Sequence, residues 1–317
     1  MQNNLVELIQ ATKDSLGLSE FVIEKDYYLS KVLRHLSSVE NDNFQLVFSG
    51  GTCLAKAHRV VNRMSEDIDF KFQKKEAVHT TSKTKYLKAL KNFREQLIAL
   101  LKNTIFSVEE IKIRNEGKYL CITLKYPCIF PPNTALRPHL LLEFTDSKIR
   151  LPTKNLPVIT LIENTLGTMS DLVPCTLKCI SIEETAAEKW VGLTRRIAAI
   201  DRGYYVNDIT LVRHLYDLSA IYKANQLGES FSQIIGDIIS NDAKQFKNQH
   251  PEYNNNPMQE IQRSLSLLKT DPIWKTHYQN FIDAMVYDQV PTHPYDDTIQ
   301  LVERIGRKIL ALPENKS

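Results

Sequence analysis

The sequence lacks both a long hydrophobic run and a strong excess of either charge. No apolar stretch approaches the roughly 20 residues that a membrane-spanning helix needs. Glu7, Lys13 and Asp14 occur where a signal peptide would be apolar. The net charge of +3, from 40 basic and 37 acidic residues, is too close to balance to indicate nucleic-acid binding by itself. We therefore expect a cytoplasmic protein with no membrane partner, in which any RNA-binding surface is local.

Cysteine patterns that would indicate disulfides or zinc are also missing. The chain has 5 cysteines, an odd number, and no pair of them has Cys-x-x-Cys spacing. Cys175 and Cys179 have no histidine nearby that could complete a zinc site. Buried thiols that form no disulfide are the expected state. No internal repeat or low-complexity segment is present.

The length and the order of patterns predict two domains. A chain of 317 residues exceeds what one compact core usually covers, and 43% apolar residues support a packed fold. Strand-like and helical patterns alternate at first, and after a connection with Pro152, Pro157 and Pro174 the pattern becomes helical. We predict an α/β (α+β) domain with a small mixed sheet over residues 1–170, followed by a mostly helical domain over residues 171–317.

A short apolar run ends in two adjacent glycines. Residues 44–48 are rich in strand-forming side chains, and Gly50 and Gly51 allow a sharp turn after them. A helix is expected to start at Thr52, with its hydroxyl capping the first turn. The exposed N–H groups of such a turn favour an anion such as a triphosphate. Lys56 follows one turn later and is expected to offset the charge of the triphosphate.

Two aspartates follow this turn within twenty residues. Asp67 and Asp69 are two positions apart, so on a strand both carboxylates lie on one face while Ile68, Phe70 and Phe72 lie on the other. Paired carboxylates suit Mg²⁺, which usually reaches a protein through one or two acids plus the phosphates of a substrate. The turn and the acid pair together indicate nucleotide chemistry. They are compatible with a nucleotidyltransferase, a kinase or a glycosyltransferase with an Asp-x-Asp metal site.

These two segments resemble one known family. The Gly-Gly-Thr-x-Leu-x-Lys run at residues 50–56, with Arg59 and Arg63, and the Met-Ser-Glu-Asp-Ile-Asp-Phe run at residues 64–70 are similar to the AbiEii/AbiGii nucleotidyltransferase toxins. The resemblance implies a polymerase-beta-like nucleotidyltransferase from a bacterial toxin-antitoxin or abortive-infection system. It implies a nucleoside triphosphate substrate, one or two Mg²⁺ ions, a tRNA acceptor and a cognate antitoxin.

Glu143 lies within an apolar strand pattern at residues 139–145, where an ionised carboxylate needs a partner. In the superfamily that the chain resembles, a third acid on a neighbouring strand completes the carboxylate set. The resemblance therefore implies that Glu143 helps to bind metal or accepts the proton of the attacking hydroxyl. The alternative is that Glu143 lies at a strand end in water.

The helical part carries two further segments that resemble family motifs. Lys189 borders an apolar stripe, and such a lysine commonly extends to water. The resemblance implies instead that it contacts the nucleotide phosphates. Asp217 lies in residues 213–218, which resemble the family motif Arg-Asp-x-x-Asp-Leu. His214 replaces the first aspartate of that motif. Asp217 either pairs with Arg213 one turn away or orients Lys189 or an acceptor group, whereas His214 is expected to be structural.

Other segments are expected to support the site. Residues 1–40 have helical spacing and include Glu24-Lys25-Asp26, interpreted as structural. A helix is predicted over residues 84–102, and a hairpin over residues 108–126. In the predicted enzyme the helical domain closes a cleft that holds the active site. Kinase-like transfer of the γ-phosphate to a protein or small molecule, or a nucleotide-binding protein without turnover, are the alternatives.

Overall fold

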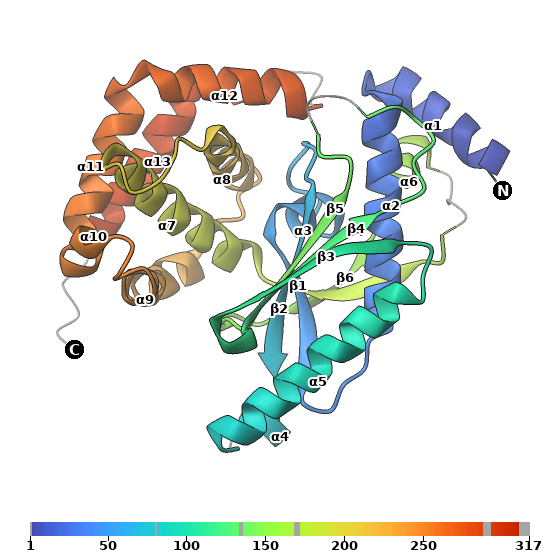
Figure 1. Ribbon diagram of the computed structural model, residues 1–317. Helices are drawn as coiled ribbons and strands as arrows, with labels where there is room; N and C mark the ends of the chain where they lie inside the picture. The colour runs from blue at the N-terminus through green and yellow to red at the C-terminus, as the bar shows by residue number, and fades with distance from the viewer. Residues whose placement is uncertain (1, 80, 133–135, 168–171, 288–292, 311–317) are drawn as a thin grey trace. The chain divides into compact units, whose positions relative to one another are not determined.

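The chain forms two units, each with its own core. The computed structural model describes residues 2–79, 81–132, 136–167, 172–287 and 293–310 (Figure 1). Contacts between residues divide the chain into an amino-terminal unit, Met1–Ile180, and a carboxyl-terminal unit, Ser181–Ser317. The amino-terminal unit contains a mixed seven-stranded sheet with helices, and the carboxyl-terminal unit is helical. The predicted mixed α/β fold class is therefore confirmed.

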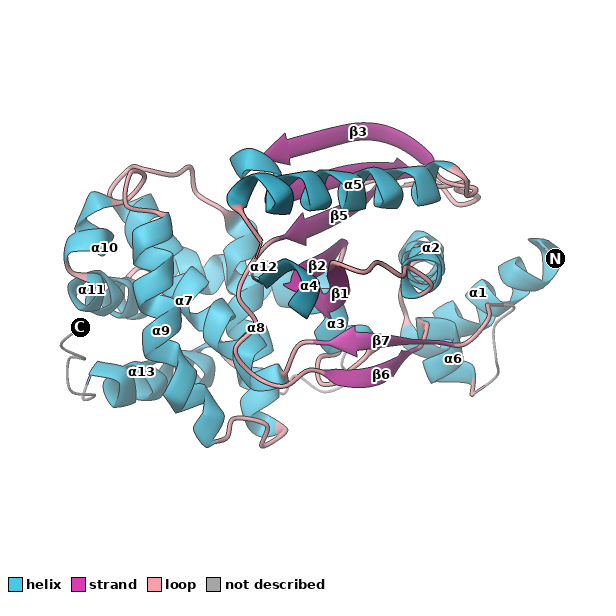
Figure 2. Cartoon of the chain, turned by 90° about the horizontal axis from the view of Figure 1, so that it is seen from below, coloured by secondary structure: helices cyan, strands magenta, loops and turns pink. Residues whose placement is uncertain are grey.

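The sheet has the strand order β3-β4-β5-β2-β1-β7-β6. In Figure 2 the sheet runs from β3 at the top to β6 at the bottom. Its strands are β1 (Phe44–Ser49), β2 (Asp67–Lys74), β3 (Ser107–Arg114), β4 (Tyr119–Lys125), β5 (Leu140–Thr145), β6 (Lys154–Val158) and β7 (Cys175–Cys179). The central strand β2 pairs antiparallel with β1 and parallel with β5. Strand β4 pairs antiparallel with both β3 and β5. The predicted hairpin over residues 108–126 is present as β3 and β4.

The central strands alternate between an apolar face and a polar face. The apolar face is buried and contains Leu46, Phe48, Ile68, Phe70, Phe72, Leu120, Ile122, Leu124, Leu140, Leu142 and Phe144. The polar face carries Ser49, Asp67, Asp69, Tyr119, Cys121 and Glu143 at the alternate positions. Because side chains alternate along a strand, burying the apolar set fixes the acids on the opposite face.

The helices of the amino-terminal unit pack against the sheet and against one another. They are α1 (Gln2–Leu16), α2 (Glu20–Ser37), α3 (Gly50–Lys56), α4 (Glu76–His79), α5 (Lys83–Lys102) and α6 (Leu161–Leu166), with the 3₁₀ turn η1 (Asn115–Gly117). Phe93 of α5 stacks on Phe44 with ring centroids 5.5 Å apart and meets Phe72 edge-on at 5.4 Å, so α5 packs on the apolar face. The helix predicted over residues 84–102 is confirmed. The helical pattern of residues 1–40 forms α1 and α2.

The proline-containing connection holds more structure than its sequence indicates. Strand β6, helix α6 and strand β7 lie between Arg150 and Ile180, where we expected a loop. Strand β6 tolerates Pro157 because it is the last strand of the sheet, and an edge strand has N–H groups that need no ladder partner. Thr160 and Glu163 form a reciprocal capping box that begins α6.

The carboxyl-terminal unit consists of helices packed around α7. They are α7 (Ile182–Asp201), η2 (Ile209–Val212), α8 (Arg213–Lys223), α9 (Glu229–Gln245), α10 (Pro251–Asn255), α11 (Pro257–Thr270), α12 (Pro272–Met285) and α13 (Tyr295–Leu310). Trp190 of α7 is fully buried and donates its indole N–H to the carbonyl of Val302 on α13, 3.3 Å away. Within the described ranges, no helix combines the length and apolar character needed to cross a membrane.

The cysteines form no disulfide, as predicted, but not all of them are buried. Cys53, Cys121 and Cys179 are buried, Cys175 is half-buried and Cys128 is exposed. Burial raises the pKa of the Cys53 thiol well above its usual range. The expectation of uniformly buried thiols is therefore wrong for Cys128, which lies in the loop after β4.

Candidate functional site

The glycine turn (residues 49–52) lies directly against the second aspartate. Gly50 has φ of +75°, a conformation that L side chains rarely adopt. A Cβ atom at this position would lie 1.9 Å from Oδ2 of Asp69. The Ser49 hydroxyl also donates to the backbone carbonyl of Asp69 at 3.2 Å. The turn and the carboxylate therefore meet at one end of the β1–β2 pair.

Thr52 has a different local role from the one predicted. Helix α3 begins at Gly50, two residues earlier than expected, and Ser49 is its N-cap residue. The Thr52 hydroxyl donates to the backbone carbonyl of Asp67 instead of capping the helix. The prediction that Thr52 caps the helix is wrong, because this hydrogen bond ties α3 to the start of β2. Thr52 still belongs to the turn that faces the acids.

The third acid occupies the neighbouring register position. Asp69 of β2 is the Cα partner of Glu143 on the parallel strand β5, and Asp67 is paired with Leu141. Partnered residues on adjacent strands, which lie about 4.8 Å apart, point to the same face. Asp67, Asp69 and Glu143 therefore share the polar face. All three side chains are half-buried.

A tyrosine orients the carboxylate of Glu143. Tyr119 of β4 donates its hydroxyl to Oε1 of Glu143 at 2.6 Å. The register pairs Glu143 with Cys121, so Tyr119 is its diagonal neighbour on the same face. Burial and this hydrogen bond raise the pKa of Tyr119 well above its usual value, which keeps the hydroxyl protonated.

An arginine from the loop before β5 contacts the first aspartate. Nη1 of Arg137 lies 2.9 Å from Oδ1 of Asp67. Two side chains hold the backbone of Arg137: its N–H donates to Glu66 Oε2 at 2.7 Å, and its carbonyl accepts from Lys25 Nζ at 2.7 Å. Lys25 and Glu66 also contact each other at 2.8 Å. This arrangement positions Arg137 beside the acid pair.

Lys56 is buried and contacts helix α2. Its side chain is only 5% exposed, and Nζ lies 2.5 Å from Oδ1 of Asp26 and 2.8 Å from the Ser30 hydroxyl. Burial lowers the pKa of Lys56, while the Asp26 carboxylate opposes that shift. The other oxygen of Asp26 accepts from the N–H of Leu161 at the start of α6. These contacts favour a structural role for Lys56 over the predicted phosphate contact.

The Glu24-Lys25-Asp26 segment of α2 is structural, as interpreted from the sequence, but it is buried rather than a solvated face. The three residues are 0%, 0% and 5% exposed. The Glu24 carboxylate accepts from the backbone N–H groups of Ile129 and Phe130 at 2.7 and 3.2 Å. Together these three residues connect α2 to the 128–130 loop, to Arg137 and to α3.

Lys189 and Asp217 form a buried ion pair in the carboxyl-terminal unit. Nζ of Lys189 lies 2.8 Å from Oδ2 of Asp217, and the side chains are 9% and 0% exposed. Lys189 therefore does not extend to water, and Asp217 orients it. His214 Nδ1 is 3.4 Å from the same ammonium. Burial, with the cations of Lys189 and Arg213 nearby, lowers the pKa of His214 well below its usual value, so a neutral ring faces Lys189.

The donor set on the sheet fits a hard divalent cation. Asp67 and Asp69 offer carboxylate oxygens on one face of the sheet. The contact of Asp67 with the Arg137 guanidinium shows that this carboxylate can hold a cation. In the described ranges, no three His, Cys, Asp or Glu side chains are grouped closely enough to hold a metal by themselves. Mg²⁺ commonly takes one or two carboxylates and completes its shell with substrate phosphates and water. The acid pair fits that pattern.

The structure thus brings together Gly50, Gly51, Thr52, Asp67, Asp69 and Glu143 on the amino-terminal unit, and Lys189 with Asp217 on the carboxyl-terminal unit. Tyr119 and Arg137 are functional candidates that sequence reasoning missed. Strand alternation places Tyr119 on the polar face once the register with β5 is known. Arg137 has no such signal, because it lies in an irregular proline-rich loop.

Comparisons with known proteins show one family match. The sequence profile described as "Nucleotidyl transferase AbiEii toxin, Type IV TA system" matches residues 31–301, which include parts of both units. A search of curated proteins finds no match. Among solved structures, the chain is similar to a crystal structure from H. pylori described as a candidate nucleotidyltransferase. The two share 15% sequence identity with a TM-score of 0.40, over 92% of this chain and 96% of that chain.

Proposed function

We propose that this chain, which belongs to the AbiEii nucleotidyl transferase toxin family, adds a nucleotide from a nucleoside triphosphate to the acceptor end of a tRNA. Family membership makes the chain a nucleotidyltransferase. The tRNA acceptor, the use of Mg²⁺ and a toxic effect that an antitoxin opposes are parts of the proposal. So is a cytoplasmic location, where nucleoside triphosphates and tRNA are both present.

The contact between Gly50 and Asp69 carries the proposal. A turn without side chains lets a phosphate approach the backbone closely, and here the same turn lies against a carboxylate. Glu143 follows in the next strand at the partnered position. A close backbone approach beside adjacent acids is a combination suited to the metal complex of a nucleoside triphosphate.

In this proposal Asp67 and Asp69 hold Mg²⁺, and Gly50, Gly51 and Thr52 position the triphosphate. When bound, the ion would stabilise negative charge on the transferred phosphate and on the leaving oxygen. The hydrogen bond from Thr52 to the Asp67 carbonyl supports a fixed distance between the turn and the acids. Such a fixed geometry matters because the reaction rate falls steeply when a reacting group is misplaced.

Glu143 is proposed to accept the proton of the acceptor hydroxyl. The hydroxyl oxygen then bonds to the α-phosphorus, the bond from that phosphorus to the oxygen bridging to the β-phosphate breaks, and pyrophosphate leaves. The Tyr119 hydroxyl holds Oε1 of Glu143, so the carboxylate is oriented before the acceptor binds. Tyr119 is a positioning residue in this scheme.

Lys189 is proposed to contact the phosphates, a role carried over from the family resemblance. Its ammonium pairs with the fully buried Asp217, so the phosphate contact rests on the family resemblance and not on this ion pair. The neutral ring of His214 adds no charge next to the ammonium. Lys56 has no part in the proposed phosphate contacts, since Asp26 holds its ammonium.

Product analysis tests this function. Each nucleoside triphosphate, labelled on either the α- or the γ-phosphate, is incubated with Mg²⁺, total RNA and either the wild type or Asp69→Asn. We expect α-label in a tRNA band and release of pyrophosphate, both lost in Asp69→Asn. Transfer of γ-label with release of a nucleoside diphosphate would instead indicate a kinase. No consumption of any nucleotide would indicate a binding protein.

A further inference from the structure

We propose that Arg137 is a displaceable counter-ion of Asp67. It neutralises this carboxylate in the nucleotide-free protein, leaves it when a divalent cation binds, and then contacts the triphosphate. The inference rests on the proposed function, because it assigns Asp67 to the metal.

The Arg137–Asp67 contact is close but accessible. Nη1 lies 2.9 Å from Oδ1, and the two side chains are 41% and 16% exposed. The guanidinium is open to water and the carboxylate is half-buried, so water screens the pair, and a competing cation can replace the guanidinium. A divalent ion at the acid pair and the guanidinium would both draw on the negative charge of the Asp67 carboxylate. Binding of one therefore opposes binding of the other.

The backbone of Arg137 is held much more firmly than its side chain. Its N–H and carbonyl groups contact Glu66 and Lys25, both at 2.7 Å, and Lys25 is 0% exposed. The guanidinium can thus rotate away from Asp67 while its attachment point stays beside the site. This gives the pair of buried Lys25 and half-buried Glu66 a function as the anchor of a movable cation.

The chemistry of arginine suits both positions. Its planar group donates parallel hydrogen bonds to carboxylates and to phosphates with similar geometry, and it remains charged at any physiological pH. A triphosphate bound at Gly50 and Gly51 would bring phosphate oxygens to the acid pair. The released guanidinium then finds an anionic partner at the same site.

Arg137→Gln tests the proposal with two measurements on the full chain. The first is Mn²⁺ binding without nucleotide, followed by electron paramagnetic resonance, in which we expect about two- to fivefold tighter binding because the competitor is removed. The second is the affinity for a non-hydrolysable nucleoside triphosphate with Mg²⁺, which we expect to fall about five- to twentyfold. Opposite signs are not expected from a purely structural residue.

Arg114→Gln is the matched control. Arg114 is an exposed arginine at the end of β3, and its loss changes the net charge equally without touching Asp67. It should change neither affinity by more than about twofold. Unchanged Mn²⁺ affinity in Arg137→Gln, or a loss of both affinities, would overturn the inference.

Asp69→Asn separates this inference from the proposed function. If Asp69→Asn binds Mn²⁺ as tightly as the wild type does, the proposed metal site itself is wrong, and the inference fails with it. If binding depends on Asp69 but Arg137→Gln leaves it unchanged, the metal site stands and only the counter-ion role is wrong.

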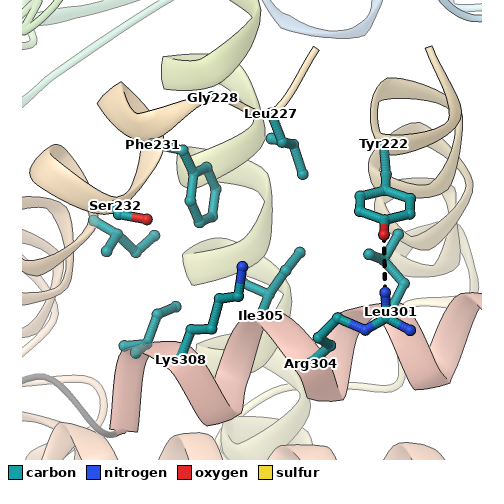
Figure 3. A pocket seen from close by; sticks show the side chains of 11 residues that line it. Tyr222, Leu227, Gly228, Phe231, Ser232, Leu301, Arg304, Ile305 and Lys308 are labelled. Atoms are coloured by element: carbon teal, nitrogen blue, oxygen red, sulfur yellow. Dashed lines mark hydrogen bonds between the residues drawn. The ribbon is translucent and has the colours of Figure 1, made fainter. Parts of the chain in front are cut away.

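A cavity in the carboxyl-terminal unit carries a second, independent inference. We infer that it binds a compact apolar molecule bearing one carboxylate. The cavity has a volume of about 160 Å³ and lies between the end of α8, the start of α9 and α13 (Figure 3). Its apolar lining consists of Leu227, Phe231, Ile235, Leu301, Ile305 and Ile309.

Size and charge define the class of ligand. A cavity of about 150 Å³ lined by apolar side chains accommodates a single aromatic ring. Arg304 and Lys308 are exposed, lie one helical turn apart on α13 and both line the cavity. Arg304 donates to the Tyr222 hydroxyl at 2.8 Å, which fixes its guanidinium at the rim. An anionic group at this rim would meet two cations.

The surroundings favour a small molecule over a protein partner. In the described part of the carboxyl-terminal unit, the exposed large apolar side chains are Tyr204, Val206, Ile209, Tyr222 and Ile273. Only Tyr222 among them lines the cavity. A stable protein interface usually buries more than about 1,000 Å² in total, which requires an apolar surface extending well beyond a single cavity.

Phenylpropionate and its uncharged analogue phenylpropionamide test this site by calorimetric titration of the full chain. We expect the carboxylate to bind about fivefold more tightly than the amide. The exposed substitutions Arg304→Gln and Lys308→Gln together should remove that preference, whereas Arg307→Gln, which alters a cation outside the lining, should retain it. Equal binding of the two compounds, no binding of either, or an equal loss in Arg307→Gln would overturn the inference.

Discussion

Substitution of Gly50 by alanine is the most informative perturbation of the glycine turn. The residue has φ of +75°, so a Cβ atom adds backbone strain of about 1–2 kcal/mol. The same Cβ would lie 1.9 Å from Oδ2 and 2.7 Å from Cγ of Asp69. Relieving that overlap by moving the carboxylate or the strand costs about 1–3 kcal/mol more.

Gly203→Ala provides a matched control. Gly203 has φ of +76°, but a Cβ atom there would have no heavy atom within 4 Å. It should therefore show the strain alone, about 1–2 kcal/mol in the free energy of unfolding. Gly50→Ala should cost about 2–5 kcal/mol, the sum of strain and overlap. Urea unfolding measured side by side gives the difference.

The two variants should also differ in activity. At a temperature where both are folded, Gly50→Ala should lose nucleotide transfer, because the Asp69 carboxylate is displaced, and Gly203→Ala should retain it. Equal unfolding free energies for the two variants would refute the contact between the turn and Asp69. Full activity in Gly50→Ala would refute its importance for function.

Three further substitutions test single contacts. Lys56→Met should lower the free energy of unfolding by about 3–5 kcal/mol, because it leaves the Asp26 carboxylate buried without its cation; an unchanged urea midpoint with weakened nucleotide binding would contradict the structural role. Tyr119→Phe should lower the rate of nucleotide transfer with little change in KM for the triphosphate, since the lost hydroxyl orients Glu143; a rise in KM alone would argue against this. His214→Asn tests a pH effect: below the ordinary pKa of 6.5 the unfolded histidine binds a proton that the folded one does not. The free energy of unfolding should therefore decrease as the pH is lowered. Between pH 7.5 and about pH 5.5 it should decrease by up to about 1.4 kcal/mol more in the wild type than in His214→Asn. Equal decreases in the two proteins, measured by urea unfolding, would contradict the lowered pKa.

Features set by local periodicity could be predicted from the sequence. Alternation along residues 67–72 places Asp67 and Asp69 opposite three buried apolar side chains, and the structure has that arrangement. The pattern of residues 84–102 predicts α5 for the same reason. Residues two apart on a strand, or three to four apart on a helix, share a face. A short stretch of sequence therefore shows which face is apolar and will be buried.

Features set by distant packing could not be predicted. Lys56 lies one turn from the glycines in sequence, but its ammonium is held by Asp26, 30 residues earlier on α2. The hydroxyl of Thr52 likewise bonds to Asp67 instead of capping its own helix. Local sequence gives the candidates for such side chains but not the partner that binds them.

Strands β6 and β7 were missed because they are short and depend on pairing across the chain. Strand β7 joins the sheet beside β1, with Phe48 paired to Cys179 more than a hundred residues later. Pro157 also reads as a strand breaker unless the edge position of β6 is known. The contact of Arg137 with Asp67 similarly spans 70 positions in the sequence.

A crystal structure with Mn²⁺ and a non-hydrolysable nucleoside triphosphate tests the central claim most directly. The account predicts an anomalous peak within coordination distance of the Asp67 and Asp69 carboxylates, with the triphosphate against the backbone of Gly50 and Gly51. Nucleotide density elsewhere on the protein, or a metal peak without either aspartate as a ligand, would contradict it.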